Sequence, residues 1–353
     1  MKALRIAGID IVYAISICVV VCFSLSVGLT GRESTLPAVS FDLIADTFTV
    51  LFLFLNGIMA SLIMYRENSS RYKVRVYMVR KGLFFIAIGV LVSFLWPIQI
   101  LITLGCLFLI TPLLTQLSSP ILRVLYIISV TAIVLLFSIG DVRGVSQAPT
   151  FEISVNFIVN YLSYITVSGY FSLLPWTIFF IGGLLFGRHD FLHPKVKRTA
   201  SFCGWAAIGI GSIIQILGGA LFSSTSLSKS ALIFPFFNSP KFNVVSFILI
   251  STGLSVIIIN VFLTRGEKKT WIETMLQQLG SFKYTLYVNH IIYGLILILL
   301  FGRGGINSVS VVAAIIGFYF AVSIVFTFFW KKQFTLGPVE WVLKMLARSN
   351  ENT

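Results

Sequence analysis

Residues 7–29 read AGIDIVYAISICVVVCFSLSVGL, an apolar run interrupted by a single charged residue, Asp10. A bilayer core about 30 Å thick is crossed by about 20 apolar residues in an α-helix. The run is therefore long enough to span a membrane. Because it lacks a small-residue cleavage site and is followed by further apolar runs, we expect a retained transmembrane helix and no cleaved signal peptide.

The rest of the chain repeats this pattern. Similar apolar runs cover residues 43–64, 82–97, 100–117, 121–140, 171–187, 200–222, 243–264, 284–301 and 308–330. Of the 353 residues, 57% are hydrophobic and 11% are charged, whereas soluble domains have about 25% charged residues. This excludes a water-soluble enzyme, a disordered chain and a fibrous repeat. The sequence predicts an all-α polytopic integral membrane protein of about ten transmembrane helices, one domain over 1–353 with a short cytoplasmic amphipathic segment at 333–348.

The cationic side chains predict the orientation. Lys and Arg number 26 against 12 Asp and Glu, which gives a formal net charge of +14. Only five of these cations fall on segments predicted to lie outside, namely Arg32, Arg143, Lys229, Lys241 and Arg303. The others fall inside when both termini are cytoplasmic, as the positive-inside rule requires. The charge therefore indicates orientation and attraction to an anionic inner leaflet, and nucleic-acid binding is not expected.

Cysteine and glycine positions point to packing. Cys18, Cys22, Cys106 and Cys203 lie within apolar runs and have neither CxxC nor Cys/His zinc spacing, so we expect buried thiols and no metal. The glycine pairs 182–183 and 218–219 are interpreted as points of close helix packing.

Polar side chains inside the predicted spans are candidate site residues, because a polar group in hydrocarbon is costly. His290 is the only histidine within a span, and a neutral imidazole can act as a general base. Alternatively, it forms a hydrogen bond between helices that serves packing alone. Asp10 could be a second catalytic group, a solvated acid or a partner of Arg5.

Further candidates for substrate binding are Asn56, Trp96, Gln99 and Asn289. In the predicted topology Asp10, Asn56, Asn289 and His290 lie in the cytoplasmic half of the membrane. They could converge on one inward-facing vestibule.

Cations crowd the segment interpreted as an inner loop over residues 65–81, which carries Arg66, Arg71, Lys73, Arg75, Arg80 and Lys81. Such groups bind phosphate, so the loop could hold a nucleotide-like donor such as coenzyme A, with Arg71, Lys73 and Arg80 as the candidates. The positive-inside rule explains the same residues without a ligand. No Walker A, GxGxxG, HExxH or complete GxSxG motif occurs, and we expect no tightly bound cofactor.

Four segments together resemble the YeiB-like family of bacterial membrane proteins. They are GSFKYTLYVNH at 280–290, FTLGPVEWVLKML at 334–346, Leu174-Pro175-Trp176 with the later Gly187-Arg188, and WPIQIL at 96–101. This family is similar to the heparan-α-glucosaminide N-acetyltransferase group and to other membrane acyltransferases. The resemblance implies a multi-pass protein of the bacterial cytoplasmic membrane. It also implies transfer of an acyl group from cytoplasmic acyl-CoA to a glycan, lipid or small-molecule acceptor, with Trp176 near the substrate.

The first helix departs from the family pattern. Family members usually have an Asp, an Arg three residues later, and an Asn or His near the middle of this helix. Asp10 is kept, whereas Tyr13 and Ser24 stand at the other two positions. Either the site is shifted toward His290 and Asp10, or the chemistry is lost.

Two functions remain open. In the first, the protein is an acyltransferase that uses acyl-CoA as a co-substrate, and His290, helped by Asp10 or Asn289, deprotonates the acceptor. In the second, it is a non-catalytic transporter or an export or immunity partner. The altered first helix and Pro97 and Pro112 favour the second, while the lack of an internal repeat disfavours a transporter.

Overall fold

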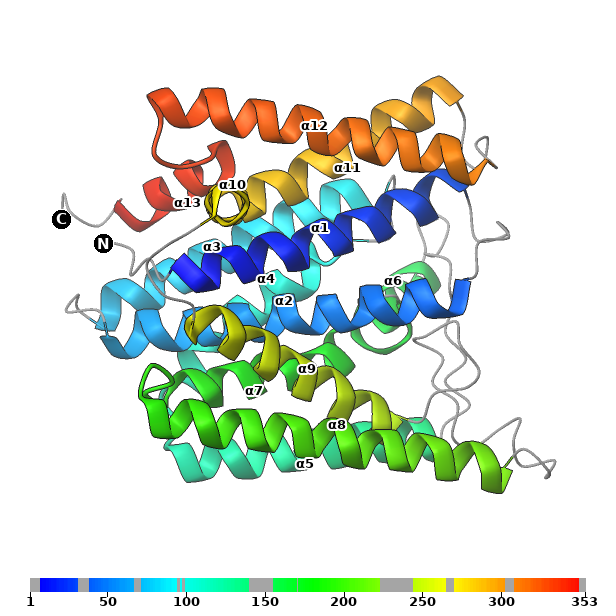
Figure 1. The fold of residues 1–353 in the computed structure, drawn as a ribbon, viewed down its shortest axis with the longest axis vertical. Helices are drawn as coiled ribbons and strands as arrows, with labels where there is room; N and C mark the ends of the chain where they lie inside the picture. The colour runs from blue at the N-terminus through cyan, green and yellow to red at the C-terminus, as the bar shows by residue number, and fades with distance from the viewer. Residues whose placement is uncertain are drawn as a thin grey trace. The chain divides into compact units, whose positions relative to one another are not determined.

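The computed structural model describes residues 7–30, 38–66, 71–93, 96, 99–139, 155–169, 171–222, 244–264, 270–301 and 308–348, and the regular structure within these ranges is helical. The helices are α1 (Ala7–Thr30), α2 (Ala38–Arg66), α3 (Arg71–Ser93), α4 (Leu101–Leu114), α5 (Ser119–Ile139), α6 (Val155–Ser163), α7 (Leu173–Gly187), α8 (Pro194–Phe222), α9 (Val244–Thr264), α10 (Trp271–Gly280), α11 (Lys283–Phe301), α12 (Val309–Gln333) and α13 (Pro338–Arg348) (Figure 1). A π-helical turn, η1 (Tyr164–Ser168), follows α6.

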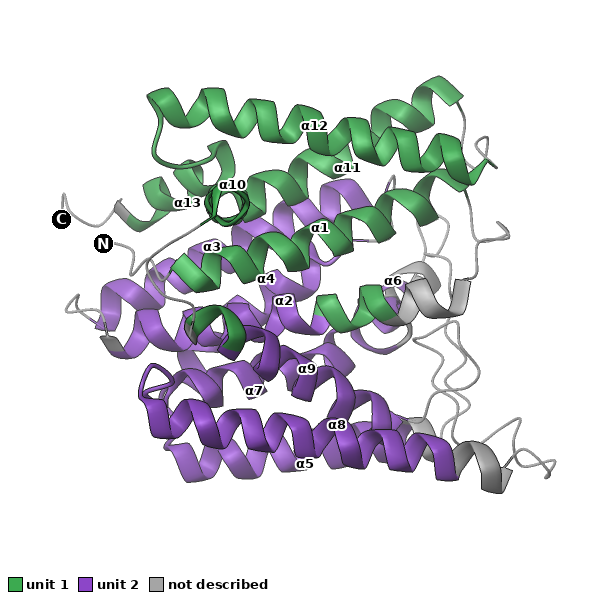
Figure 2. Ribbon diagram, in the orientation of Figure 1, with its two compact units in different colours: residues 1–49, 261–353 green, residues 50–260 purple. Residues whose placement is uncertain are grey.

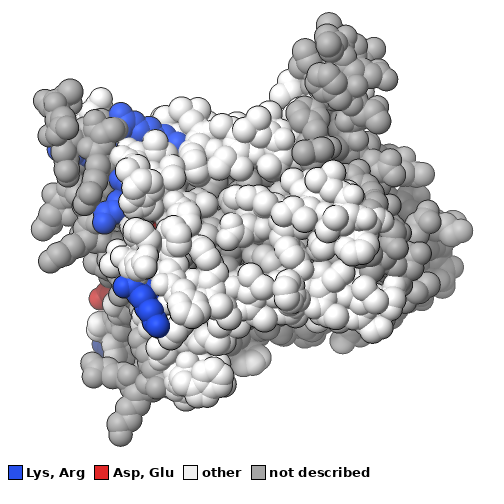
Figure 3. All heavy atoms as spheres, turned by 90° about the horizontal axis from the view of Figure 1, so that it is seen from above, with Lys and Arg blue, Asp and Glu red and all other residues white. Residues whose placement is uncertain are grey.

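The helices have the lengths and composition of membrane spans. Within the described residues, eight helices are long and apolar enough to cross a membrane, and α4 and α7 are shorter apolar helices. Each predicted apolar run coincides with one of these helices, so the prediction of an all-α polytopic membrane protein is confirmed. On the face shown in Figure 3, the charged side chains of the described residues gather at one edge, as expected of a surface in contact with lipid. The cytoplasmic location of both termini stays a prediction.

The third helix begins earlier than predicted. It starts at Arg71, whereas the apolar run starts at residue 82. The interpretation of residues 71–81 as part of a loop is therefore wrong. Lys and Arg are good helix formers, and their long side chains can extend from a helix end toward water. Their charge thus did not end the helix, and Arg71 and Arg75 lie one turn apart on the same helix face.

Packing divides the chain into two compact units (Figure 2). Unit 1 comprises residues 1–49 and 261–353, and unit 2 comprises residues 50–260. Among the described helices, α1 and α10 to α13 belong to unit 1, and α3 to α8 belong to unit 2, while α2 and α9 contribute to both. The single domain over 1–353 stays a prediction.

Unit 1 is built around α1. The end of α10 lies directly on α1, because a β-carbon at Gly280 would collide with the carbonyl oxygen of Asp10. Toward the other end of α1, Leu29 packs with Leu297 of α11 and Val312 of α12 in a small buried cluster. Glycine at residue 280 therefore allows a helix contact that no larger residue would permit.

Unit 2 contains two similarly close helix pairs. A β-carbon at Gly183 of α7 would collide with the carbonyl oxygen of Phe54 in α2, and α3 and α4 meet at Gly82 and Gly105. The interpretation of Gly183 as a packing point is confirmed, whereas the side chains at 218–219 lie outside the described residues. These contacts hold α2 against α7 and α3 against α4, and ends of these helices supply the site described next.

Candidate anion-binding site

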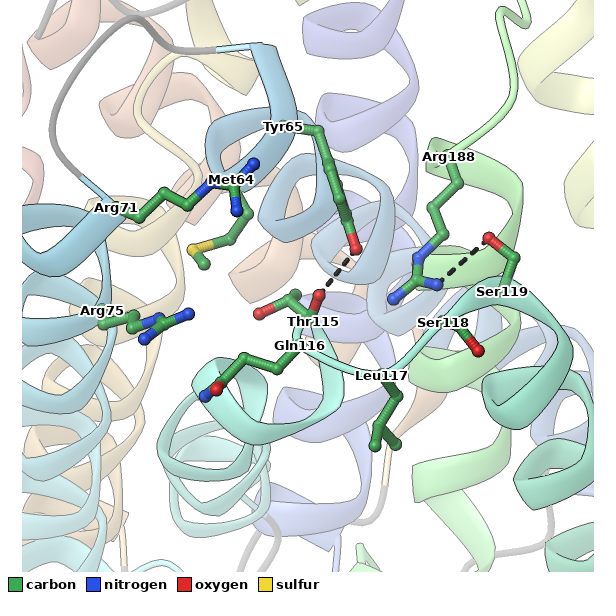
Figure 4. A pocket seen from close by; sticks show the side chains of 10 residues that line it. All are labelled: Met64, Tyr65, Arg71, Arg75, Thr115, Gln116, Leu117, Ser118, Ser119 and Arg188. Carbon is green, nitrogen blue, oxygen red and sulfur yellow. Dashed lines mark hydrogen bonds between the residues drawn. The ribbon is translucent and has the colours of Figure 1, made fainter.

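A cavity of about 460 Å³ lies in unit 2 where several helix ends meet. Its lining residues are Met64, Tyr65, Arg71, Arg75, Thr115, Gln116, Leu117, Ser118, Ser119 and Arg188 (Figure 4). They come from the end of α2, the start of α3, the turn between α4 and α5, the start of α5, and the residue that follows α7. Ligand sites of proteins typically have this volume.

The turn between α4 and α5 shapes the floor of the cavity. Thr115 Oγ1 donates a hydrogen bond to the Thr111 carbonyl at 2.8 Å, and Gln116 Nε2 donates to the Pro112 carbonyl at 2.8 Å. The Tyr65 hydroxyl donates to the Thr115 carbonyl at 2.6 Å. These bonds satisfy the carbonyl groups at the end of α4, which would otherwise present partial negative charge to the cavity.

Two helices begin at the cavity. Arg71 is the first residue of α3 and Ser119 is the first residue of α5, and both line the cavity. The first turn of a helix has backbone N–H groups without intrahelical partners and carries partial positive charge. The two helix starts add positive potential near Arg71 and Ser119, whereas α2, α4 and α7 end at the cavity with the partial negative charge of their carbonyl groups, so the three arginines supply most of the preference for an anion.

Arg188 is held in place by its neighbours. Its Nη1 donates to Ser119 Oγ at 3.2 Å, and its Nη2 donates to the Leu114 carbonyl at 3.2 Å. Its guanidinium carbon lies 5.2 Å from the centroid of the Tyr65 ring, within the range of a cation–π contact. The side chain is thus oriented before any ligand arrives.

Among the lining residues that the structure describes, the cavity has open hydrogen-bond donors and no compensating acid. The Nε atoms of Arg75 and Arg188 are buried and have no hydrogen-bond partner. None of the ten lining residues is Asp or Glu, whereas three are Arg. Buried donors are normally paired, so three guanidinium groups without a carboxylate form a site that is suited to a phosphate-bearing ligand.

One of the three residues predicted to bind the cofactor lines this cavity. Arg71 lines it, whereas Lys73 and Arg80 do not, and the Lys73 side chain is exposed. Arg75 and Arg188 were not selected from the sequence. Arg75 could have been selected from its spacing of four residues from Arg71, if residues 71–81 had been interpreted as a helix. Arg188 lies far from Arg71 and Arg75 in the sequence, and no motif around it identified it as a binding residue.

His290 lies in unit 1 and pairs with α1. Its Nε2 is 3.1 Å from the Ser24 hydroxyl oxygen, and both side chains are buried. The imidazole also packs edge-on against the Tyr287 ring at a centroid distance of 4.7 Å. The residue that replaces the Asn or His of the family pattern is therefore the partner of His290.

The structure does not bring Asp10 and His290 together. Asp10 precedes Ser24 by fourteen residues in α1, a distance of about 21 Å along a helix. Asp10 is buried, and its backbone lies against Gly280. Asn289 is partly buried next to His290, whereas Asn56 belongs to unit 2. The catalytic roles of these residues stay predictions, and Asp10 does not assist His290 directly.

The remaining substrate-binding candidates lie in the core of unit 2. The Asn56 side chain donates to the Phe52 carbonyl at 2.8 Å. Gln99 Oε1 accepts from the Leu101 backbone N–H at 2.6 Å, and so supports the start of α4. Trp96 and Trp176 are buried, and Trp176 packs on Phe179 at a centroid distance of 5.9 Å. None of these four residues lines the cavity.

Glu273 is buried, and so are two charged side chains beside the predicted apolar runs; none of the three was selected from the sequence. Asp46 of α2 lies in unit 1, and Lys81 of α3 lies in unit 2 with its Nζ 3.8 Å from the centroid of the Phe108 ring. Asp46 and Lys81 each lie at or near the end of a predicted apolar run, and this position in the sequence could have identified them as candidates.

The cysteines are free thiols; Cys18, Cys22 and Cys106 are partly buried, and the prediction of a buried thiol is wrong for Cys203. This side chain is exposed on α8 beside Phe202 and Trp205, which also face outward. An apolar run in a membrane helix includes residues that face lipid, so apolarity did not imply burial within the protein. Among the described residues no group of His, Cys, Asp and Glu side chains could hold a metal ion.

The fold and the cavity define a polytopic membrane protein with a cationic ligand site. The chain belongs to the family described as heparan-alpha-glucosaminide N-acetyltransferase, catalytic, whose model matches residues 5–223. Residues 186–350 match the model described as protein of unknown function (DUF418). A search of curated proteins found no match.

These matches confirm the resemblance to YeiB-like proteins and to the heparan-α-glucosaminide N-acetyltransferase group, and identify a membrane acyltransferase-like protein. The ten cavity residues lie within the first matched range, and His290 lies within the second.

Proposed function

We propose that this protein transfers an acyl group from cytoplasmic acyl-CoA to a glycan, lipid or small-molecule acceptor at a bacterial cytoplasmic membrane. The observation that carries the proposal is the cavity lined by Arg71, Arg75 and Arg188, with no carboxylate among the lining residues that the structure describes. Coenzyme A has a diphosphate and a further phosphate on its ribose, and arginine binds phosphate oxygens with two parallel hydrogen bonds. In the predicted topology this cavity faces the cytoplasm, where acyl-CoA is found.

The family supports the same reaction class. The matched family is named for an N-acetyltransferase, an enzyme that places an acetyl group on an amine. In such a transfer the acceptor nitrogen or oxygen forms a bond to the thioester carbonyl carbon, and the carbon–sulfur bond breaks. The acceptor loses a proton, and the departing thiolate of coenzyme A gains one. A general base is therefore needed on the acceptor side.

We propose His290 as this base. Its Nε2 lies 3.1 Å from the Ser24 hydroxyl, so a hydrogen-bond partner within α1 already orients the imidazole. The ring takes the acceptor proton at Nε2 when the acceptor displaces the Ser24 hydroxyl. Ser24 is then a positioning residue.

The experiment uses the full chain purified in detergent and acetyl-CoA labelled in the acetyl group. Release of free coenzyme A and transfer of label to membrane glycan and lipid extracts are measured together. We expect activity in the parent protein and a loss of about a hundredfold or more in His290→Ala. Equal rates for the parent and His290→Ala would show that the base has been assigned to the wrong residue.

A matched pair of variants tests the cavity in the same assay. Arg75→Gln removes a cavity cation, whereas Lys73→Gln removes an exposed cation from the same helix. We expect a raised KM for acetyl-CoA in the first variant and an unchanged KM in the second. A protein that binds acetyl-CoA but transfers nothing to any extract would instead support the non-catalytic export or immunity partner.

A further inference from the structure

We infer that the end of α12 and the exposed face of α13, both in unit 1, form a binding site for an anionic phospholipid. The site combines the exposed cations Lys332 and Lys344 with the exposed aromatic side chains of Phe328, Phe329 and Trp341. It shares no residue with the arginine cavity of unit 2. The inference is therefore independent of the proposed function.

The last turn of α12 places a cation at the boundary between acyl chains and head groups. α12 has 25 residues, is apolar enough to span a membrane, and carries Lys331 and Lys332 in its last turn. The Lys332 Nζ lies 4.7 Å from the centroid of the Phe328 ring and 5.2 Å from that of the Phe329 ring. Both rings are more than half exposed. The ammonium group is thus held about one turn back along a helix whose apolar surface contacts lipid.

The turn after α12 keeps α13 at the membrane surface. The Trp330 indole N–H donates to the Leu336 carbonyl at 2.9 Å, and the Phe334 backbone N–H donates to the Trp330 carbonyl at 2.8 Å. The Phe334 ring also packs on the Trp330 ring at a centroid distance of 4.6 Å. Residues 334–337 alone connect the two helices (Figure 1), and four residues span at most about 14 Å. α13 therefore lies beside the point where α12 leaves the hydrocarbon.

α13 has one face that packs on unit 1 and one face that is open. Leu343 is buried, and Glu340 accepts hydrogen bonds from the start of α11. The opposite face carries Trp341, Lys344 and Met345, which are exposed and spaced as neighbours on a helix surface. Tryptophan among cations is typical of helices that lie in the membrane interface, where the ring enters the head-group layer and the cation binds phosphate.

The charge and the depth of the site together select a phospholipid. Residues 328–347 contain three lysines and one acid, Glu340, and the Glu340 carboxylate is already bonded to α11. The outward charge is therefore positive. A soluble anion would leave the Phe328 and Phe329 rings uncovered, and a soluble protein does not reach rings on a membrane-spanning helix. A phospholipid contacts the lysines with its phosphate and the two rings with its acyl chains.

The test uses phospholipids with brominated acyl chains, which quench tryptophan fluorescence on contact. They are titrated into the full chain in neutral detergent, and the contribution of Trp341 is the difference between the parent and Trp341→Phe. We expect half-maximal quenching of Trp341 at a mole fraction of brominated phosphatidylglycerol at least about fivefold lower than that of brominated phosphatidylcholine. Equal mole fractions for the two lipids would overturn the inference.

Variants assign the preference to the two lysines. In Lys332→Gln/Lys344→Gln the two lipids should quench Trp341 alike, whereas Lys332→Arg/Lys344→Arg should keep the preference for phosphatidylglycerol. Lys73→Gln is the matched control, because it removes an exposed cation from the start of another apolar helix, α3. It should leave the preference unchanged. A preference that survives in Lys332→Gln/Lys344→Gln would place the anionic lipid elsewhere on the protein.

Thermal unfolding gives a second readout that does not use fluorescence quenching. A ligand that binds the folded state raises the unfolding midpoint, so phosphatidylglycerol should raise the midpoint of the parent more than that of Lys332→Gln/Lys344→Gln. The midpoints in phosphatidylcholine show that both proteins are folded. An equal rise in both would overturn the inference. So would a Trp341 that neither lipid quenches in a protein that sediments as a dimer, because a second copy of the chain would then cover the α13 face.

Discussion

The Glu340 carboxylate of unit 1 and the cavity arginines of unit 2 are hydrogen-bonded to different extents. In unit 1 the Glu340 carboxylate is partly buried and accepts hydrogen bonds from three donors. Its Oε1 accepts from the backbone N–H groups of Tyr284 and Thr285 at 2.7 and 3.3 Å, and its Oε2 accepts from Thr285 Oγ1 at 2.5 Å. In unit 2 the buried Nε atoms of Arg75 and Arg188 have no partner. Buried polar groups of a stable fold are normally paired, so Glu340 serves structure and the arginines serve a ligand.

Glu340 joins two of the four sequence segments that carried the family resemblance. It belongs to GPVEW in α13, and its carboxylate caps the start of α11 within GSFKYTLYVNH, where the helix has unpaired N–H groups. The Val339 backbone N–H donates to Thr285 Oγ1 at 3.1 Å and strengthens the junction. Gly337 completes it, because a β-carbon there would lie 2.6 Å from Thr285 Oγ1. The same helix α11 carries His290.

The largest expected effect comes from Glu340→Ala. The change leaves the N–H groups of Tyr284 and Thr285 without their acceptor and opens space beneath α13, so we expect a loss of about 2–4 kcal/mol of stability. Thermal unfolding of the full chain in detergent measures this loss as a lower midpoint. Glu340→Gln retains an acceptor oxygen and should change the midpoint much less. An unchanged midpoint in Glu340→Ala would show that the carboxylate does not stabilise unit 1.

Replacing the cavity arginines should have the opposite effect, a loss of ligand binding with little loss of stability. In the double variant Arg75→Gln/Arg188→Gln, we expect coenzyme A binding to weaken about a hundredfold, equivalent to about 2.7 kcal/mol. Its thermal midpoint without ligand should fall by only a few degrees, because Arg188 gives up its bonds to Ser119 and the Leu114 carbonyl but no acid among the described lining residues loses a partner. Calorimetric titration and unfolding scans on the same samples measure both quantities. A large fall in the midpoint together with intact binding would reverse the assignment of structure and function.

The pH dependence of stability separates the two units further. Burial raises the pKa of Glu340 above its ordinary value of 4.5, although the hydrogen bonds from Thr285 and the nearby Lys283 act in the opposite direction. The folded state therefore favours the protonated carboxyl. The stabilisation is fully present below pH 4.5 and decreases as the pH rises through the raised pKa. The unfolding midpoint of the parent should fall over this interval more than that of Glu340→Gln, and parallel profiles would contradict the prediction.

Much of the fold could be predicted from the sequence, because a membrane helix is defined by a local property, the length of an apolar run. The start of α3 was predicted wrongly because residues 71–81 are rich in charge, so no apolar run marks this part of the helix. The candidate site was harder to predict for a different reason. Arg188 reaches Ser119 across 69 positions of sequence, and Glu340 reaches Tyr284 across 56. Such contacts depend on tertiary packing, so a single sequence showed the cations of the site but not which of them meet.

The smallest expected effect, and the most direct comparison of the two units, is the response to salt. The cavity binds a mobile ligand through charges that include the exposed Arg71, and at 0.5 M salt such charges are screened beyond about 4 Å, against about 10 Å at 0.1 M. We expect coenzyme A binding to weaken a few-fold over this range.

The contacts of Glu340 are short, partly buried and with neutral donors, so the difference in unfolding midpoint between the parent and Glu340→Ala should change little with salt. Titrations with coenzyme A and unfolding scans at both salt concentrations test these two expectations. If the Glu340→Ala difference shrank with salt in proportion to the loss of binding, the Glu340 junction would be an exposed ion pair. The contrast between paired and open charge would then no longer distinguish structure from site.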